Sequence, residues 1–220
     1  MPMTNKNKMT KACLFDLDGV VFHTEPQYTV FWGEVGRTFH PEIENFEHKI
    51  KGMTLQQVYD LYFAGDVAAR KTITARLNTF EANMEFPYID GFEDYLAHIR
   101  KEGIATAVVT SSNQAKMKSV YERHPDFCKS FDRVFTSEDF SESKPSPDCY
   151  LRAAAHFGVH PSECIVFEDS INGLRSGLAS GARLIALATT LPEERLRDYT
   201  PEVIADFTEL LSATEKTKKE

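Results

Sequence analysis

Short apolar runs recur along this chain, with helical stretches between them. The runs cover residues 12–15, 105–109, 133–135, 164–167 and 184–188. Runs this short and this continuously apolar are typical of parallel strands that helices cover on both faces. The helices are expected over residues 92–101, 114–123, 148–157 and 171–180. This alternation predicts an α/β fold with a doubly wound parallel sheet.

One stretch of the chain breaks the alternation. Residues 26–87 contain no strand pattern, but they contain helical patterns over 28–35, 55–63 and 67–83. About 60 residues of helix between two strands is more than an ordinary crossover connection needs. We therefore expect a small α-helical domain at 26–88, inserted into an α/β core formed by 10–25 and 89–214. Proline and polar residues interrupt the pattern at both joints, as domain boundaries usually do.

Charge and cysteine usage exclude several classes of protein. The chain has 33 acidic and 25 basic side chains and a net charge of −8, whereas binding to nucleic acid calls for a basic face. No apolar run approaches the roughly 18 residues of a membrane span, and residues 1–9 lack the apolar segment of a secretory signal. The four cysteines do not have the spacing of a zinc site or a disulfide framework. We expect a cytoplasmic protein with neither nucleic acid nor membrane as a partner.

Polar residues come directly after three of the predicted strands, and a lysine precedes the fourth strand. In an open parallel sheet the carboxyl ends of the strands meet at one edge, where functional groups gather. The candidate residues at this edge are Asp16, Asp18, Thr110, Ser111, Ser112, Asn113, Lys144, Glu168 and Asp169. We expect these side chains to form one site.

Four carboxylates at one sheet edge repel one another unless a cation joins them. The four are Asp16, Asp18, Glu168 and Asp169. Hard oxygen ligands with few other protein donors suit Mg²⁺ better than zinc or iron. The sequence therefore predicts a magnesium site with ligands drawn from these four residues.

A magnesium ion beside a lysine and a strand-end hydroxyl group is typical of a phosphate site. Asp16 could attack phosphorus and form an aspartyl-phosphate, and Asp18 could protonate the leaving oxygen and then activate water. Thr110 and the two backbone N–H groups after it could hold phosphate oxygens at the start of a helix. Lys144 would bind both the nucleophile and the phosphate through its charge. Phosphoryl transfer is the chemistry that this set of residues predicts.

Four motifs in this sequence resemble, in order, those of the haloacid dehalogenase superfamily. They are residues 16–24 (DLDGVVFHT), 110–113 (TSSN), 144–145 (KP) and 168–173 (EDSING), so that the resemblance spans about residues 11–190. It implies a Rossmann-like core and an Mg²⁺-dependent phosphotransferase, usually a phosphatase for small phosphate esters. The family roles agree with those assigned above to Asp16, Asp18, Thr110 and Lys144. Asp18 disfavours dehalogenation, because the dehalogenase branch lacks this second aspartate.

The helical insertion resembles the cap of the beta-phosphoglucomutase-like subgroup. Residues 50–55 (IKGMTL) resemble the cap loop that reaches the active site, which makes Lys51 and Gly52 candidate substrate-binding residues. The mutase itself has an arginine at the position of Leu55, a histidine near that of Tyr28, and a lysine near that of Leu77. A bisphosphate intermediate needs cations at both ends. These departures favour hydrolysis over mutase activity.

The prediction is therefore an Mg²⁺-dependent phosphatase for a small phosphorylated metabolite, such as a sugar phosphate, acting as a monomer or weak homodimer. A phosphohexose mutase remains an alternative, if Lys51, Ser112 or Asn113 holds a second phosphate. Inorganic pyrophosphate is a further possible substrate. A non-enzymatic module with a phosphorylatable aspartate, like a response-regulator receiver, is disfavoured by the helical insertion and by Asp18.

Overall fold

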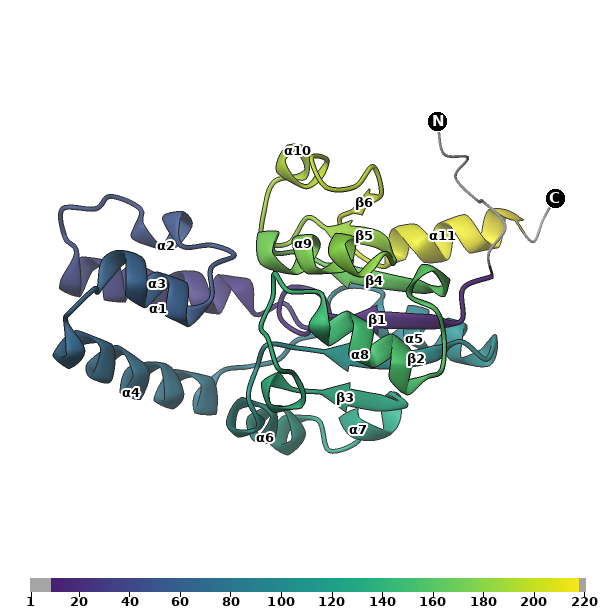
Figure 1. Cartoon of the computed structure of the whole chain (residues 1–220), viewed down its shortest axis with the longest axis horizontal. Coiled ribbons are helices and arrows are strands. Elements are labelled where there is room, and N and C mark those ends of the chain that lie inside the picture. The colour runs from purple at the N-terminus through teal and green to yellow at the C-terminus, as the bar shows by residue number, and fades with distance from the viewer. Residues whose placement is uncertain (1–8, 218–220) are drawn as a thin grey trace.

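The structure is a computed structural model that describes residues 9–217, with side chains from 9 to 212. Within this part of the chain it contains a six-stranded sheet in the order β3-β2-β1-β4-β5-β6, in which all neighbours are parallel (Figure 1). The strands are β1 (Ala12–Phe15), β2 (Ala105–Val109), β3 (Arg133–Phe135), β4 (Cys164–Glu168), β5 (Arg183–Leu187) and β6 (Val203–Ile204). The first five lie at the predicted runs, to within one residue. The sequence pattern did not predict β6, because two residues are too few to show a period.

Helices cover both faces of the sheet. They are α5 (Phe92–Lys101), α6 (Gln114–Arg123), α7 (Phe127–Ser130), α8 (Asp148–His156), α9 (Ile171–Ser180), α10 (Glu193–Leu196) and α11 (Thr208–Thr217). One hydrophobic cluster holds side chains of α5, α6 and α7, and another holds side chains of α8, α9 and α10. Phe15 and Phe167 belong to the first cluster, whereas their neighbours Leu14 and Val166 belong to the second. The central strands β1 and β4 are thus buried on both sides, which explains their continuously apolar sequences and confirms the predicted fold class.

Of the five helices that the structure describes between β1 and β2, the first four lie beside the sheet in space (Figure 1). These inserted helices are α1 (Glu25–Phe39), α2 (Phe46–Lys49), α3 (Leu55–Tyr62) and α4 (Val67–Asn83). They surround a hydrophobic cluster of their own, which includes Phe31, Val35, Phe46 and Ile73. Helix α1 is longer than its predicted core of 28–35, and Pro26 in its first turn is well placed to start it.

The two segments that join the inserted helices to the sheet lie side by side. The backbone N–H of His23 donates to the carbonyl of Pro87 at 2.8 Å, and that of Ile89 donates to Val21 at 3.0 Å. The chain therefore leaves and re-enters the core at one place, close to the end of β1. Among residues 9–217, no helix combines the length and the apolar character that a membrane crossing requires.

Candidate active site

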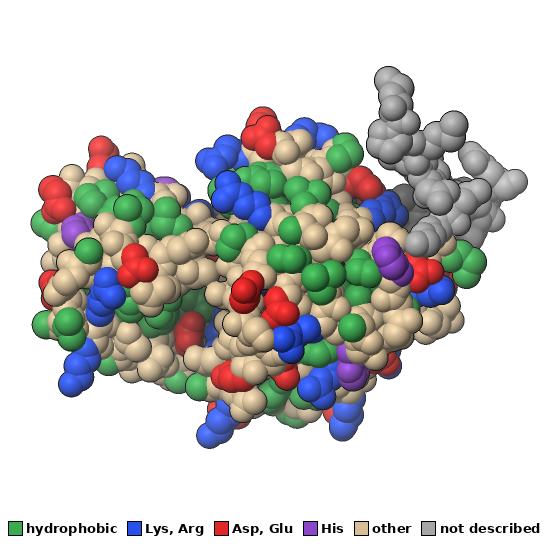
Figure 2. Space-filling model, viewed as in Figure 1, with side chains coloured by type: hydrophobic (Ala, Val, Ile, Leu, Met, Phe, Trp, Pro, Cys, Tyr) green, Lys and Arg blue, Asp and Glu red, His purple; other side chains and the backbone are tan. Residues whose placement is uncertain are grey.

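A cavity of about 530 Å³ lies between the carboxyl ends of the strands and the inserted helices. Its wall contains most of the residues that the sequence predicted for the site, namely Asp16, Asp18, Gly52, Thr110, Ser111, Ser112, Asn113, Lys144 and Asp169. Figure 2 shows the hollow between the two parts of the molecule. We call this space the catalytic cavity. Two predicted residues lie outside its wall: Glu168 is buried beneath it, and Lys51 lines an adjoining cavity.

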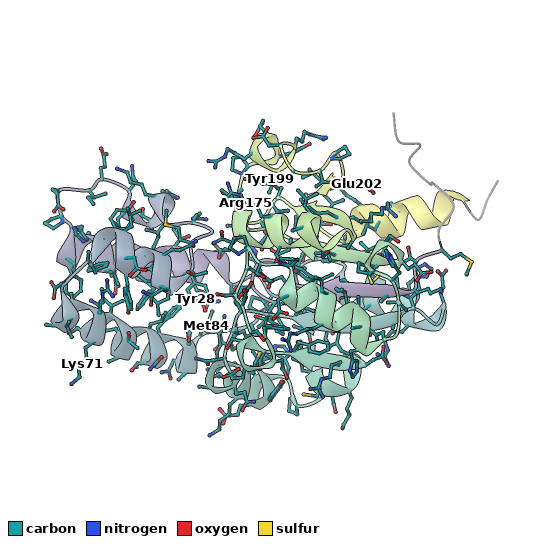
Figure 3. The ribbon with its side chains drawn as sticks, in the orientation of Figure 1. Tyr28, Lys71, Met84, Arg175, Tyr199 and Glu202 are labelled. Carbon is teal, nitrogen blue, oxygen red and sulfur yellow. The ribbon has the colours of Figure 1, made fainter. Side chains whose placement is uncertain are left out.

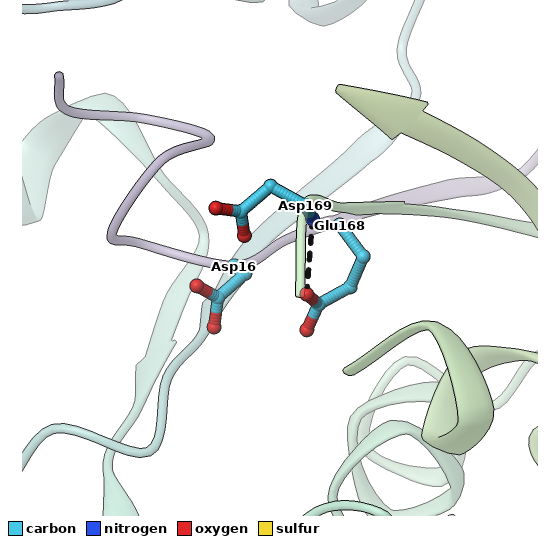
Figure 4. Close-up of side chains that lie close together, drawn as sticks. All are labelled: Asp16, Glu168 and Asp169. Carbon is cyan, nitrogen blue, oxygen red and sulfur yellow. Dashed lines mark hydrogen bonds between the residues drawn. The ribbon is translucent and has the colours of Figure 1, made fainter. Parts of the chain in front are cut away.

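Three carboxylates form a close cluster at the strand ends (Figure 4). Asp16 follows β1, Glu168 ends β4, and Asp169 comes next, and one oxygen of each lies within 4.8 Å of the others. The Oδ2 atom of Asp169 accepts a hydrogen bond from the Thr190 hydroxyl, whereas its buried Oδ1 atom has no hydrogen-bond partner among the described residues. Burying a carboxylate oxygen without a hydrogen-bond partner lowers the free energy of unfolding, and a cation bound to that oxygen would offset the loss. Asp16 and Asp169 therefore fit a hard divalent cation such as Mg²⁺.

Glu168 already has protein donors on both oxygens. Its Oε1 atom accepts from the Lys144 ammonium at 2.6 Å and from the Tyr150 hydroxyl at 2.7 Å, and its Oε2 atom accepts from the Asp169 backbone at 3.2 Å. A Cβ atom on Gly173 would lie 1.9 Å from this carboxyl group, so that the glycine makes room for it. Glu168 belongs to the cluster as predicted, but its geometry suits the orientation of Lys144 and Asp169 better than direct binding of a cation.

Lys144 connects two of the carboxylates. Its ammonium lies 2.6 Å from Oδ1 of Asp16 and 2.6 Å from Oε1 of Glu168, and its side chain is only 6% exposed. Burial raises the pKa of Asp16 to about 7, although Lys144 acts in the opposite direction. Burial likewise raises the pKa of Asp169 well above its ordinary value, and the charges of Glu168 and Asp16 add to this effect. Burial would lower the pKa of Lys144, but the two carboxylates raise it well above its ordinary value and keep the ammonium charged.

Asp18 does not join the cluster, although the sequence predicted it as a magnesium ligand beside the other three. Its carboxylate is held by donors on the other side of the cavity, namely the Thr24 hydroxyl at 2.8 Å, the Ser112 hydroxyl at 3.2 Å and the ammonium of Lys116. The three donors, and above all the charge of Lys116, explain why this side chain points elsewhere.

The loop after β2 approaches the cavity at the start of α6. The Thr110 hydroxyl is buried and accepts from the backbone N–H of Ser112 at 3.0 Å, while Ser111 is exposed. The side chain of Asn113 caps α6 by accepting from the backbone of Lys116 at 2.9 Å. The structure thus brings Thr110, Ser111 and Ser112 to the cavity, but it also gives the Asn113 oxygen a structural partner.

The loop between α2 and α3 reaches the core. The Gly52 carbonyl accepts from the side-chain amide of Asn172 at 2.8 Å, and the same amide donates to Gln57 at 2.8 Å. Lys51 lies 3.6 Å from the carboxylate of Glu25 and is about one-fifth exposed. The predicted substrate lysine is therefore close to the site, and it has an acidic partner that the sequence did not reveal.

A smaller inner cavity of about 240 Å³ extends from the catalytic cavity into the inserted helices. Four acidic residues line it, Asp18, Glu25, Glu47 and Glu81, whereas Lys51 is its one basic lining residue among those described. The Tyr28 hydroxyl donates to Glu81 at 2.9 Å, and Figure 3 shows Tyr28 between α1 and α4 at the end nearest the core. Leu55 and Leu77, two of the positions where the mutase has cations, also line this cavity. Its surroundings are acidic and aromatic.

Three contributors to the site escaped the sequence analysis. Lys116 is 4% exposed and lies 4.9 Å above the ring of Tyr28, in addition to its bond with Asp18. Tyr150 and Thr190 donate to Glu168 and Asp169. The only signal for Lys116 was its place in the first turn of the helix after the TSSN motif, and the other two residues come from segments with no motif.

A parallel sheet that carries acids and a lysine at its strand ends, with helices inserted after the first strand, defines a Rossmann-like class of α/β protein with an active site at the carboxyl ends of its strands. A family model described as haloacid dehalogenase-like hydrolase matches residues 10–181, and the chain belongs to this family. The predicted family is thereby confirmed.

Relatives agree with this assignment. Hexitol phosphatase A of Escherichia coli is 32% identical over 195 residues, which cover 86% of this chain and 88% of that protein. Protein SUPPRESSOR OF QUENCHING 1, chloroplastic, of Arabidopsis thaliana is 30% identical over 207 residues, which cover 89% of this chain but only 19% of that protein's length. The solved structure of a HAD hydrolase, family IA, variant 3, from Entamoeba histolytica is 26% identical with a TM-score of 0.79, and the match covers 91% of this chain and 95% of that one. A hydrolase family with a phosphatase relative supports the prediction of a HAD-type phosphoric monoester hydrolase.

Proposed function

We propose that this chain is an Mg²⁺-dependent phosphatase that hydrolyses a small sugar or polyol phosphate through an aspartyl-phosphate on Asp16. The observation that carries the proposal is the surroundings of Asp16. One of its oxygens is bonded to Lys144, and its carboxylate lies in the wall of an open cavity beside Asp169, whose Oδ1 atom is unpaired. We further propose that residues 26–88 act as a cap over this cavity, in a cytoplasmic enzyme that is a monomer or weak homodimer.

The residues divide the reaction into two steps. An Asp16 oxygen forms a bond to phosphorus as the bond from phosphorus to the leaving oxygen breaks, and Asp18 donates a proton to that oxygen. Asp18 then takes a proton from water, which attacks the phosphorus of the aspartyl-phosphate and releases Asp16. Lys144 and the loop of Thr110 and Ser111 hold the phosphoryl oxygens, and bound Mg²⁺, held by Asp16 and Asp169, would neutralise part of their charge.

The inner cavity favours a neutral, hydroxylated leaving group. Carboxylates accept hydrogen bonds from hydroxyl groups but repel a second phosphate, and Glu25, Glu47 and Glu81 line this cavity. Asp18 lines both cavities, and so it lies where such a leaving group would join the phosphoryl group. The acidic lining therefore argues against the mutase and pyrophosphatase alternatives. It agrees with the hexitol phosphatase relative.

A phosphate-release assay with Mg²⁺ over a panel of hexitol, sugar and nucleoside monophosphates tests the proposed function. We expect turnover of at least one monophosphate and little release from pyrophosphate. Beta-glucose 1-phosphate with a trace of its bisphosphate provides the comparison with a mutase, because glucose 6-phosphate without free phosphate would identify one. A long-lived acyl-phosphate without turnover on any ester would identify a non-enzymatic module.

Asp18→Asn should lower kcat by a factor on the order of 10² to 10⁴, the usual contribution of a general acid–base group. The asparagine oxygen can still accept from Thr24, and its NH₂ group can donate to the Ser112 hydroxyl oxygen, so the fold and the phosphate site should persist. We therefore expect inhibition by a phosphate analogue such as orthovanadate to keep a near-normal constant. A variant with undiminished kcat would refute the role of Asp18.

Removing Mg²⁺ should destabilise the protein more at high pH than at low pH. The folded chain holds the Asp16 proton up to about pH 7, whereas the unfolded chain loses it near the ordinary pKa of 3.8. A raised folded-state pKa means that the free energy of unfolding falls as the pH rises between these two values. A cation bound by the ionised carboxylates would offset this loss, by about 2.7 kcal/mol at 100 times its dissociation constant.

Thermal unfolding with Mg²⁺ and with EDTA, at about pH 5.5 and about pH 8, measures this difference. The shift caused by Mg²⁺ should be larger at the higher pH, and Asp169→Asn should reduce it. Equal shifts at both pH values would count against a magnesium site at these carboxylates.

A further inference from the structure

A second large cavity, of about 680 Å³, lies on the other side of the loop that carries Lys51 and Gly52. Its wall combines residues of the inserted helices with residues of α9 and of the chain around α10. Gly52, Met53 and Asn172 line both this cavity and the catalytic cavity. Of the residues predicted for the site, the wall contains Lys51 and Gly52 but none of the residues at the strand ends. We call this space the basic cavity.

Positive charge dominates the wall of the basic cavity, although the whole chain has a net charge of −8. Its basic lining residues are His48, Lys49, Lys51, Arg175 and Arg195. Its one acidic lining residue is Asp60, which already accepts from Gln56 at 2.7 Å and lies 3.4 Å from Arg70. The charge of this wall is thus opposite to that of the inner cavity.

Three of these cations have no counter-ion among the residues whose side chains the structure describes. Lys49, Arg175 and Arg195 form neither an ion pair nor a side-chain hydrogen bond with any residue between 9 and 212. Figure 3 places Arg175 on the side of α9 that faces the inserted helices, and Figure 2 shows basic side chains gathered at this edge. Positive side chains brought together in a concave site raise the local electrostatic potential, and this potential attracts anions.

Apolar side chains complete the wall of the basic cavity. Met53 and Leu61 are 36% and 62% exposed, respectively, and Ile171 and Leu191 line the core side. The volume lies within the range of about 300–1,000 Å³ that is typical of small-molecule sites. A ligand that fills the basic cavity would therefore need both negative charge and an apolar body.

We infer that the basic cavity binds an organic anion with at least two negative charges and an apolar or aromatic body, the chemistry of a nucleoside di- or triphosphate. Guanidinium groups bind phosphate oxygens through two parallel hydrogen bonds, for which Arg175 and Arg195 are available. Lys49 would add a third charge, and Leu61 and Leu191 would cover the base. This ligand site is separate from the proposed phosphatase reaction, which takes place in the catalytic cavity.

Calorimetric titration of the full chain with ATP, in EDTA so that no turnover occurs, tests this inference. We expect one ATP per chain, with adenosine and tripolyphosphate each binding at least about tenfold more weakly. The double variant Arg175→Gln/Arg195→Gln should weaken ATP binding at least about tenfold. A control double variant, Arg152→Gln/Arg183→Gln, makes the same change in net charge at two exposed arginines outside the cavity and should bind like the wild type.

Two results would overturn the inference. One is equal ATP affinity in the two double variants, which would assign the binding to the catalytic cavity or to net charge alone. The other is binding of tripolyphosphate as tight as that of ATP, which would show that the apolar wall adds nothing to the affinity. Arg175 and Arg195 have no side-chain partner between residues 9 and 212, and the two control arginines lose only exposed ion pairs, so both variants should fold. Circular dichroism checks this. Phosphate release is measured separately, so a failure of the proposed phosphatase function would leave this test intact.

Discussion

Asp16→Asn should lower kcat for phosphate release by a factor on the order of 10⁴ to 10⁶, the usual cost of removing a catalytic nucleophile. An amide oxygen is a poor nucleophile, and no other described carboxylate combines contact with the cavity and a bond to Lys144. The fold should survive, because the amide oxygen can still accept from the Lys144 ammonium. Removing a buried carboxyl whose pKa is raised should leave the stability of the metal-free protein equal or higher.

A matched control and a trapping experiment make this result specific. Asp198→Asn makes the same chemical change at an exposed position outside the cavities and should leave kcat within about twofold. Acid quenching during turnover should trap phosphate on the wild-type chain at Asp16 and leave Asp16→Asn unlabelled. Near wild-type turnover of Asp16→Asn in buffer containing Mg²⁺ would show that another group attacks phosphorus.

The central sheet could be predicted from sequence because both of its faces are covered. Leu14 and Phe15 point to opposite clusters and are both fully buried, so β1 has no polar position and stands out as an apolar run. The inserted helices could be predicted for the opposite reason, because no such run occurs between β1 and β2. The four-residue helix α2 and the two-residue strand β6 were missed, since packing against neighbours, rather than a local pattern, defines elements this short.

The sequence predicted which residues lie at the site, because the backbone of the parallel sheet determines their position, but it did not predict the direction of each side chain. Parallel strands bring the residues after β1, β2 and β4 to one edge, which places Asp16, Thr110 and Asp169 around one cavity. The direction of a side chain depends on partners that are distant in sequence, and this is why the sequence did not show that the Asp18 carboxylate lies apart from the cluster of the other three acids. Its partner Lys116 is 98 residues away and looked like any other lysine in a polar helix.

The acidic inner cavity shows the same limit. Glu25, Glu47 and Glu81 come from three segments of the inserted helices, and in the sequence they are ordinary members of an acidic chain. Only the packing of α1, α2 and α4 around one hydrophobic cluster brings them together. In the proposed enzyme, substrate selection would therefore depend on tertiary structure, while the predicted chemistry depends on residues next to the strands.

Lys144→Met should lower the free energy of unfolding by about 3–5 kcal/mol and abolish turnover, because it leaves two buried carboxylates without their common cation. The ammonium lies 2.6 Å from both Asp16 and Glu168, and Glu168 is completely buried. Lys144 lowers the pKa of Asp16, so this pKa should rise further in the variant. The loss of stability should consequently grow between about pH 5.5 and pH 8, as measured by urea unfolding in EDTA.

A second substitution separates electrostatics from packing. Adding Glu168→Gln to Lys144→Met removes one of the stranded charges, so it should restore part of the lost stability while turnover stays absent. Lys118→Met changes an exposed lysine of α6, 79% exposed, and should alter stability by less than about 0.5 kcal/mol. If Lys144→Met were as stable as the wild type at pH 8, the lysine would not be neutralising these carboxylates. The site would then need another source of positive charge to hold a phosphate beside Asp16.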